Sequence, residues 1–262
     1  MPKTKKPILI AIPHCSTFVP AEIRKHMALS DFKVREETDL YTDEIFDVKN
    51  AYIVKAKIAR VVVDPNRAPD HIEHEWQLNE DGVVISITGD GKPIYDSPPS
   101  IDTIFERVEK YHNGFHEEVE ALYPKVKFLI DAHSMFSKGQ STKADAGKER
   151  AEIVLGNRDY TTCSRELTIE VKRFFEEKGL SVKVNNPYSG KYVIGYHCSR
   201  DGLPGLQIEI NRKLYMNEKT LHPHKRNIEK LNGFIEELVE KLSELVEKDE
   251  ERRKKKAKRK LS

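Results

Sequence analysis

The sequence has few cysteines and no long apolar run. Its three cysteines, Cys15, Cys163 and Cys198, include no CxxC pair. An odd number without that spacing argues against a disulfide framework and against a zinc ribbon, so we expect ordinary reduced thiols. No stretch approaches the roughly 18 consecutive apolar residues of a transmembrane helix, so we expect no membrane partner.

The N-terminal segment also lacks the features of a secretory signal. It reads MPKTKKPILIAIPHC, in which a few basic residues precede a short apolar run without a small-residue cleavage site. We therefore interpret the apolar run as a first strand, and we expect a cytoplasmic protein.

The net charge of +2 hides an uneven distribution of charge. Residues Arg252–Ser262 hold eight Lys or Arg side chains and no acid, so the rest of the chain is acidic. Such a run usually forms a solvated, disordered end, and nucleic-acid contact is the sharper alternative. We expect one domain over residues 1–248 and a disordered basic tail over 249–262. Apart from contact through that tail we expect no nucleic-acid partner, and nothing in the sequence indicates a particular oligomeric state.

Short apolar runs alternate with helical periodicities along the chain. The runs that predict strands are Pro7–Pro13, Ala51–Lys57, Ile58–Val63, Lys127–Ile130, Ile153–Leu155, Leu180–Val184 and Leu206–Ile210. The predicted helices are one from Pro20, a short one at the end of Arg35–Phe46, Ile101–Leu122, Ser164–Glu177 with Gly179 as its cap, and a last one with an apolar seam from Ile228 to Leu245. This alternation predicts an α/β layered domain with a mixed, largely parallel sheet.

Two features of this pattern affect its interpretation. The last helix has its seam over only a few turns, which favours packing on its own domain over a dimeric coiled coil. Residues 70–100 contain several Gly, Pro and Asp and no helical period. We interpret them as a long excursion, with room for one hairpin, that could cover a pocket.

Reactive polar side chains follow four of the predicted strands. They are His14 in AIPHC, Asn66 and Arg67 in VVVDPNR, Asp131 and His133 in FLIDAHS, and Glu209 and Arg212 in LQIEINR. Because ligands of α/β sheets bind where strands end and loops begin, we expect these groups to share one crevice.

His14 and His133 are the candidate metal ligands. Catalytic zinc takes three protein ligands and keeps a position for water, and a carboxylate could be the third ligand. The segment EETDLYTDE offers five acidic side chains, among which Asp39 and Asp43 are four residues apart and would share a face if the segment is helical. A solvated acidic helix end is the alternative interpretation of this segment.

Glu209 and the two arginines suggest the rest of the chemistry. Strand alternation places Gln207 and Glu209 on the face opposite to Leu206, Ile208 and Ile210. A carboxylate beside an activated water molecule can accept its proton and pass it to a leaving nitrogen. Arg67 and Arg212 can each bind a substrate carboxylate through two parallel hydrogen bonds, with structural ion pairs as the alternative.

Taken together, these segments resemble the N-formylglutamate amidohydrolase family. The matching elements, in order over about residues 7–220, are IPHCSTFVP, ETDLYTDEIFD, VVVDPNRAP, FLIDAHSM, VLGNRDYTTCS and LQIEINRKLYMNE. The resemblance implies a three-layer α/β/α fold of the phosphorylase/hydrolase kind, related to zinc carboxypeptidases and aspartoacylases.

The resemblance also implies a function and a set of residue roles. The activity would be hydrolysis of N-formyl-L-glutamate or a related N-acyl amino acid, a linear amide, with one divalent metal, zinc by preference. The small-molecule substrate would carry a carboxylate. The implied roles are metal ligation by His14, Asp39 and His133, with Asp43 as the alternative carboxylate; catalysis by Glu209, as general base, and Arg67; and substrate binding by Asn66, Arg67 and Arg212.

The chain departs from the family pattern in three places. Ser16 stands where a Gly is usual, and Pro65 replaces a Leu. The stretch SGKYVIGYHCSRDG has Lys191 at the second position of a Gly pair, and its first arginine is Arg200. That stretch would shape the substrate pocket, so a different small amide stays an open alternative.

Two other functions are alternatives to a metal amidohydrolase. A metal-free hydrolase would use Ser134 with His133 and Asp131, but adjacent Ser and His rarely align as nucleophile and base, and GxSxG is absent. A non-catalytic protein of the same fold would bind an anion in the crevice or nucleic acid through the tail.

The segment HNGFHE also needs an interpretation. His112 and His116 are four apart, but no Glu follows the first His, so this is not the HExxH motif. We expect His112 on the surface and His116 in the pocket or next to it.

Overall fold

A six-stranded sheet forms the centre of the molecule in the computed structural model, which describes residues 4–72, 81–200 and 202–261. Its strands are β1 (Ile8–Ile12), β2 (Tyr52–Lys55), β3 (Phe128–Met135), β4 (Ile153–Gly156), β5 (Val182–Val184) and β6 (Gly205–Asn211), in the order β2-β1-β3-β6-β4-β5. β2, β1, β3 and β6 run parallel, β4 is antiparallel to β6, and β5 is parallel to β4. The predicted mixed, largely parallel sheet is confirmed.

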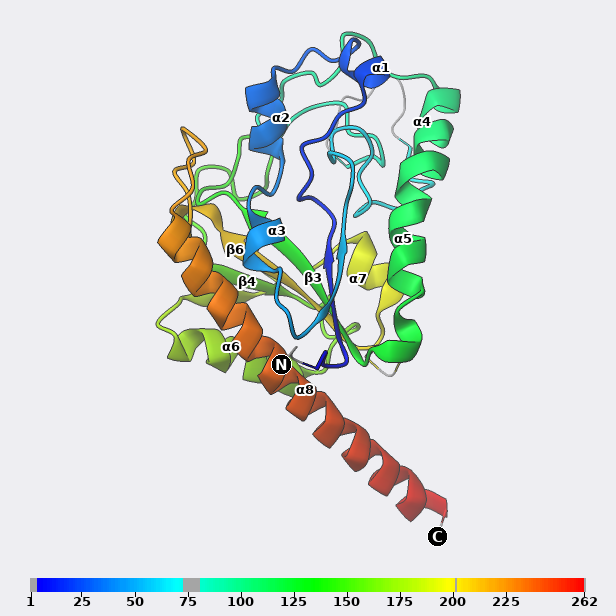
Figure 1. Ribbon diagram of the computed structural model, residues 1–262, viewed down its shortest axis with the longest axis vertical. Helices are drawn as coiled ribbons and strands as arrows, with labels where there is room; N and C mark the ends of the chain where they lie inside the picture. The colour runs from blue at the N-terminus through cyan, green and yellow to red at the C-terminus, as the bar shows by residue number, and fades with distance from the viewer. Residues whose placement is uncertain (1–3, 73–80, 201, 262) are drawn as a thin grey trace.

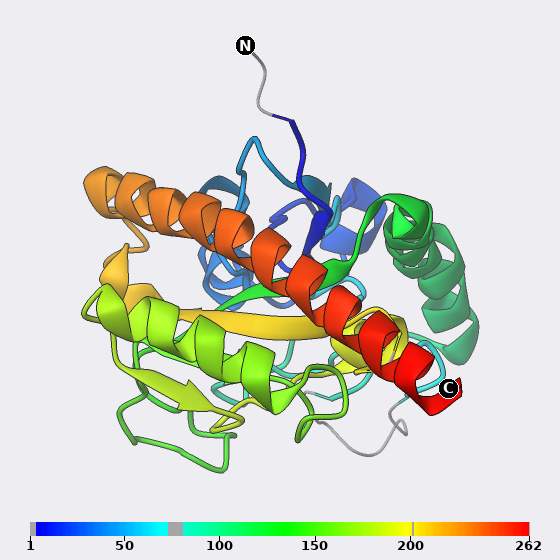
Figure 2. The ribbon, with the colours of Figure 1, turned by 90° about the horizontal axis from the view of Figure 1, so that it is seen from below.

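Helices lie on both sides of this sheet (Figures 1 and 2). The α-helices are α1 (Ala21–Arg24), α2 (Asp31–Glu37), α3 (Thr42–Ile45), α4 (Ile101–Arg107), α5 (Asn113–Glu120), α6 (Arg165–Glu177), α7 (Tyr192–His197) and α8 (Lys225–Leu261). A π-helical turn, η1 (Val108–His112), joins α4 to α5, and two 3₁₀ turns are η2 (Tyr123–Lys125) and η3 (Arg212–Leu214). The predicted helix Ile101–Leu122 is therefore close to the observed α4–η1–α5 unit.

One face of the sheet packs against α3, α6 and α8. Alternate strand residues such as Ile10, Ile130 and Ile208 point to this face and are fully buried. The seam of α8 joins the same core through residues that include Leu238 and Leu242. The prediction that the last helix packs on its own domain is confirmed.

The other face packs against α5 and α7. Leu9 and Leu129 lie on it, in one buried cluster with Phe115 of α5 and with Val193 and Ile194 of α7. This side also receives Asp131, His133, Gln207 and Glu209, because β3 and β6 alternate in register, with Asp131 beside Gln207 and His133 beside Glu209. The predicted alternation of β6 is confirmed, and it places both candidate residues on one face.

Three predicted elements differ from the observed ones. Ile58–Val63 is not a strand but a buried irregular segment, whose carbonyls at Val61 and Val62 accept hydrogen bonds from Tyr95 and Arg107. Lys127–Ile130 overlaps only the first three residues of β3, which begins at Phe128 and continues through His133 to Met135. Asp39 and Asp43 do not share a helix, because Asp39 lies between α2 and α3.

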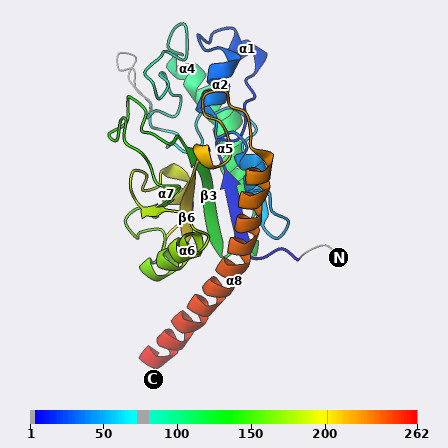
Figure 3. The ribbon, with the colours of Figure 1, turned by 90° about the vertical axis from the view of Figure 1, so that its left-hand side faces the viewer.

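The excursion after residue 70 covers the carboxyl ends of the parallel strands. Residues 73–80 lie outside the described part of the chain. Within 81–100 an isolated antiparallel bridge joins Ile87 to Pro93, which agrees with the room for one hairpin. Buried Val83, Ile85 and Ile94 pack in a second apolar cluster with Val61–Val63. Figure 3 shows these loops gathered at the end of the sheet opposite to the C-terminus.

Local signals explain where helices begin and end. The Ser164 hydroxyl accepts from Leu167 N at the start of α6, and Gly179 follows the helix with φ of 83°, which favours glycine. The helix α8 runs for 37 residues, through the segment for which the sequence predicts a disordered tail, and projects beyond the body (Figures 1 and 3). Among the described residues, no helix is both long enough and apolar enough to span a bilayer.

Candidate active site

A cavity of about 610 Å³ opens at the carboxyl ends of β1, β3 and β6. Its walls include all but one of the candidate site residues, namely His14, Asp39, Asn66, Arg67, His133, Glu209 and Arg212. The exception is Asp43, which lies in α3 and is not among the lining residues. The expected single crevice therefore exists among the described residues, and Asp39 is the one of the two alternative carboxylates, Asp39 and Asp43, that lines it.

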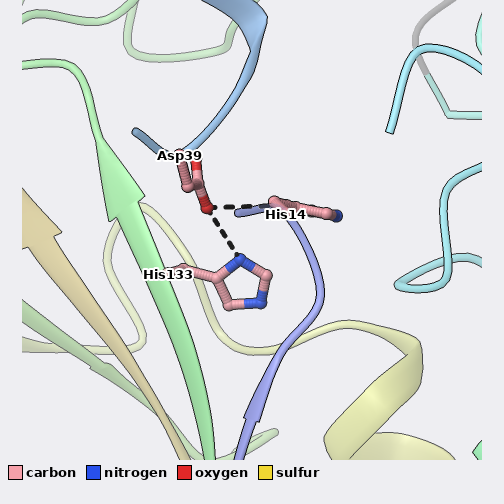
Figure 4. A group of neighbouring side chains, drawn as sticks. All are labelled: His14, Asp39 and His133. Atoms are coloured by element: carbon pink, nitrogen blue, oxygen red, sulfur yellow. Dashed lines mark hydrogen bonds and ion pairs between the residues drawn. The ribbon is translucent and has the colours of Figure 1, made fainter. Parts of the chain in front are cut away.

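His14, Asp39 and His133 form a compact buried cluster. Their ligand atoms lie within 4.8 Å of one another. Nδ1 of His14 is 3.6 Å from Asp39 Oδ2, and Nδ1 of His133 is 3.2 Å from the same oxygen (Figure 4). Two imidazoles and one carboxylate are a donor set that catalytic zinc uses, so these residues fit a divalent metal ion.

Each histidine of the cluster has a second carboxylate behind it. Nε2 of His14 is 2.7 Å from Asp64 Oδ1, and Nε2 of His133 is 2.9 Å from Asp131 Oδ1. Metal-binding histidines commonly direct the far ring nitrogen to such a carboxylate, which fixes the tautomer and the ring orientation. Both rings are thus oriented with Nδ1 toward Asp39.

Asp39 is held as a carboxylate. Its Oδ2 accepts from Ser134 N at 3.1 Å, and its Oδ1 accepts from Arg212 Nη2 at 3.0 Å. Burial would raise its pKa, but His133, His14 and Arg212 outweigh burial and hold the pKa well below the usual range. Burial would lower the pKa of His133, but Asp131 and Asp39 raise it well above the usual range.

Glu209 lies beside this cluster on β6. It is paired in register with His133, and its Oε1 accepts from Gln207 Nε2 at 2.9 Å. Burial raises the pKa of Glu209 to about 7, against the opposing effect of His133 and with further increases from Asp39 and Asp131. A carboxyl group of that pKa can both accept and return a proton near neutral pH.

Asn66 and Arg67 lie on the turn after the irregular segment. Asn66 Oδ1 accepts from Val193 N at 2.9 Å, so its amide nitrogen faces His133 Nε2 at 3.0 Å. Arg67 is 8% exposed and lines the cavity, where its Nη2 donates to Asp81 Oδ1 at 3.3 Å. Lys191 lies on the other side of Asp81, with its Nζ 3.7 Å from the same oxygen.

Comparisons with known proteins show the family of this chain. The family model for N-formylglutamate amidohydrolase matches residues 6–216. The chain belongs to the N-formylglutamate amidohydrolase family. The crystal structure of N-formylglutamate amidohydrolase from Ralstonia eutropha JMP134 is similar to this fold with a TM-score of 0.79 and 28% identity, over 94% of this chain and 96% of that one.

A gene product of Agrobacterium tumefaciens shares the fold at lower identity. Its TM-score is 0.70 with 21% identity, and 93% of each chain is covered. A search of curated proteins found none that matches this chain. The family membership therefore rests on the match over residues 6–216.

Arg212 is placed differently from a free substrate anchor of an amidohydrolase. Its guanidinium donates to the carbonyls of Glu36 and Thr38 at 2.7 and 2.9 Å, to Asp39, and through Nε to Ser134 Oγ at 3.1 Å. These contacts hold the segment that presents Asp39. The hydroxyl of Ser134 is held by the same arginine, and no contact between this hydroxyl and His133 supports a serine nucleophile.

The two histidines of the HNGFHE segment are both buried. His112 is 1% exposed, so the expectation of a surface position was wrong, and His116 is 6% exposed. They follow one another on the inner side of η1 and α5, where apolar packing would otherwise be expected. Their ring nitrogens contact the turn of Asn66 and Arg67.

Sequence reasoning missed several residues around the amidohydrolase site. Asp64 was interpreted only as part of a turn, although it binds His14, Arg60 and the backbone of Asn66. Tyr188 lines the cavity, and the Arg150 guanidinium lies 5.0 Å from the centre of the Tyr188 ring. The DPNR sequence predicts a polar turn, but nothing local predicts that its aspartate, Asp64, contacts His14, which lies 50 residues earlier.

Proposed function

We propose that this protein is a divalent-metal amidohydrolase that cleaves N-formyl-L-glutamate or a related N-acyl amino acid. The observation that carries the proposal is the cluster of His14, Asp39 and His133, with Glu209 in register beside it. The family membership supports the amide as the scissile bond. We further propose zinc as the metal and the cytoplasm as the compartment.

The proposed metal ligands are His14 Nδ1, Asp39 Oδ2 and His133 Nδ1. When bound there, a divalent ion would supply Lewis acidity that polarises an amide carbonyl and lowers the pKa of a water molecule. Ligation through Nδ1 requires the proton of His133 on Nε2, which lies 2.9 Å from the Asp131 carboxylate. Asn66 Nδ2 then loses its acceptor on His133 and can donate to a substrate oxygen.

Glu209 is proposed to move the proton. Its carboxylate takes a proton from the attacking water and delivers it to the amide nitrogen, which leaves as an amine. The pKa of about 7 suits both transfers, because neither protonation state is strongly favoured near neutral pH. The hydrogen bond from Gln207 Nε2 orients the Glu209 carboxylate, and the neutral amide adds no charge beside it.

Arg67 is proposed to bind the carboxylate of the substrate. The carboxylate of Asp81 lies between Arg67 and Lys191 at 3.3 and 3.7 Å, which supports a carboxylate site between these two cations. Asp81 is about half exposed, so a substrate carboxylate can replace it. Lys191, one of the departures from the family pattern, thereby gains a role in selecting the substrate.

The test is a hydrolysis screen over N-acyl amino acids with purified full-length protein. The protein is first stripped with a chelator and then assayed with and without added zinc, and released amine is measured. We expect hydrolysis of N-formyl-L-glutamate or a close analogue only with the metal. Equal activity after stripping would contradict the metal site, and no activity on any amide would contradict the amidohydrolase proposal.

A further inference from the structure

A chain of buried polar side chains ends on the turn that presents Asn66 and Arg67 to the cavity. Nε2 of His116 lies 2.9 Å from the carbonyl oxygen of Pro65, and Nε2 of His112 lies 2.9 Å from that of Arg67. The two histidines are four residues apart on one helical unit and therefore face the same way. The two carbonyls that they contact flank Asn66 on either side.

The carbonyls at the end of this chain and the neutral charge of the rings together fix the direction of its hydrogen bonds. A backbone carbonyl can only accept, so Nε2 of His112 and of His116 must carry the proton. Nδ1 of His116 then accepts from His197 Nε2 at 2.7 Å, and Nδ1 of His197 accepts from the Tyr123 hydroxyl. His116 and His197 are thus neutral Nε2–H tautomers. In agreement, burial lowers the pKa of His116 to about 3 and that of His197 to about 4.

The turn that holds Asn66 and Arg67 is also fixed by hydrogen bonds of Asn66 itself. The backbone N–H of Asn66 donates to Asp64 Oδ1 at 2.8 Å, and its side-chain oxygen accepts from Val193 N at 2.9 Å. With both flanking carbonyls also bound, a rotation of either peptide would break at least one buried hydrogen bond. Such a loss destabilises the rotated turn, because the unpaired group cannot reach water.

We infer that His112 and His116 are positioning residues, which hold the turn so that Asn66 and Arg67 keep their places in the cavity. The kinetic consequence rests on the proposed function, whereas the tautomers and the turn position do not. Packing alone would not require histidine here. The His116 ring lies 5.0 Å from the His197 ring and 5.2 Å from that of Tyr192, where a phenylalanine would also fit. What a phenylalanine cannot supply is the donor for Pro65.

The kinetic test compares two substitutions of one residue. In His116→Phe the ring volume stays and the donor is lost, whereas in His116→Gln an amide nitrogen stands near the position of Nε2. A displaced substrate anchor of about 1 Å costs on the order of a hundredfold. We expect kcat/KM for the N-acyl amino acid to fall about 10- to 100-fold in His116→Phe, mainly through KM, with unchanged zinc content. His116→Gln should recover most of the loss, and His26→Gln, at an exposed histidine, should equal wild type. Equal loss in Phe and Gln variants would overturn the role.

A second measurement needs neither activity nor a folded variant. NMR of the wild-type protein labelled with ¹⁵N-histidine reports which ring nitrogen carries the proton. We expect the Nε2–H tautomer for His112, His116 and His197 at neutral pH, and an Nδ1–H tautomer or a charged His116 would overturn the inference. Where His116→Phe folds, the backbone amide signals of Asn66 and Val193 should shift in it and not in His116→Gln. If wild type cleaves no amide, the proposed function fails, and these signals still decide the positioning role.

Discussion

His14 and His133 each direct one ring nitrogen to Asp39 and the other ring nitrogen to a second carboxylate. We predict that Asp39→Asn and His133→Ala lower the bound metal to near zero, because each removes one of three ligands. Asp43→Asn is the matched control, since Asp43 lies in α3 and does not line the cavity. The test is the molar ratio of metal to protein, measured by elemental analysis after dialysis for the two ligand variants and the control. Full occupancy in His133→Ala, or loss in Asp43→Asn alone, would contradict the assignment.

Glu209 is the residue that can lose its chemistry while the metal stays. We expect Glu209→Gln to keep the metal and the affinity for substrate and to lose about 10² to 10⁴ in turnover. In wild type the active form is the carboxylate, so activity should fall as pH decreases through the pKa of Glu209, which burial raises to about 7 before a metal binds. A bound cation would move this limb to lower pH. The residual activity of the Gln variant should lack the limb, and near-normal turnover would mean that another group handles the proton.

Arg67 and Arg212 are both arginines of the cavity, but their surroundings differ. Arg67 contacts the exposed Asp81, whereas Arg212 donates hydrogen bonds to Asp39, Ser134 and two backbone carbonyls. We expect Arg67→Lys to raise KM without changing metal content, because lysine cannot form the bidentate fork. Arg212→Lys should instead weaken metal binding. Esterification of the substrate carboxylate should cost roughly 1.5–3 kcal/mol of binding, and equal cleavage of ester and acid would rule out this anchor.

At the scale of single residues, the sequence was informative where chemistry and strand alternation coincide. His14, Asn66, Arg67 and His133 each follow an apolar run, Glu209 alternates with apolar residues inside one, and all five line the cavity. Asp64 and the pair His112 and His116 could not be assigned in this way. Their partners lie at distant positions in the chain, and only tertiary packing makes a buried histidine a donor to a particular carbonyl.

The strands differ in how well their apolar patterns predict them. β1 and β6 are buried runs with clear boundaries, and both were predicted. Ile58–Val63 has the same β-branched composition but forms no strand, because its backbone groups find partners outside the sheet, in Phe18, Tyr95 and Arg107. Composition reports that a segment is buried, whereas the partner of its backbone depends on the fold.

The last helix separates into a packed part and a basic extension. Its apolar seam ends near Val246, which is 3% exposed, and Leu242 is fully buried. We expect deletion of Arg252–Ser262 to leave the free energy of unfolding and the turnover unchanged. Leu242→Ala should lower that free energy by about 2–5 kcal/mol, as buried truncations do. Urea unfolding of both variants tests this, and a large loss from the deletion would mean that the tail docks on the body.

At the scale of the whole protein, the buried titratable groups have opposite effects on how the free energy of unfolding depends on pH. Glu209 and Glu37 have pKa values raised by burial, so they favour the folded state at lower pH. His116 and His197 act in the opposite sense, because burial holds their pKa near 3 and 4 while an unfolded histidine titrates at about 6.5. The net dependence of stability on pH is therefore a balance, and only a comparison with a variant isolates the histidines.

The sign of the histidine contribution follows from proton counting. Between about pH 6.5 and pH 4 the unfolded chain binds a proton at each of these histidines and the folded protein does not, so the free energy of unfolding decreases as pH falls. Between pH 7.5 and 5.5 this amounts to roughly 1 kcal/mol for each histidine. His116→Gln removes one such group. The stability difference between wild type and His116→Gln, measured by urea unfolding at both pH values, should therefore shrink by roughly 1 kcal/mol at the lower pH. The exposed His26→Gln should show no such change. Parallel stability curves for wild type and His116→Gln would show that His116 is not held neutral in the folded protein, and the fixed direction of the Tyr123–His197–His116 chain would then be wrong.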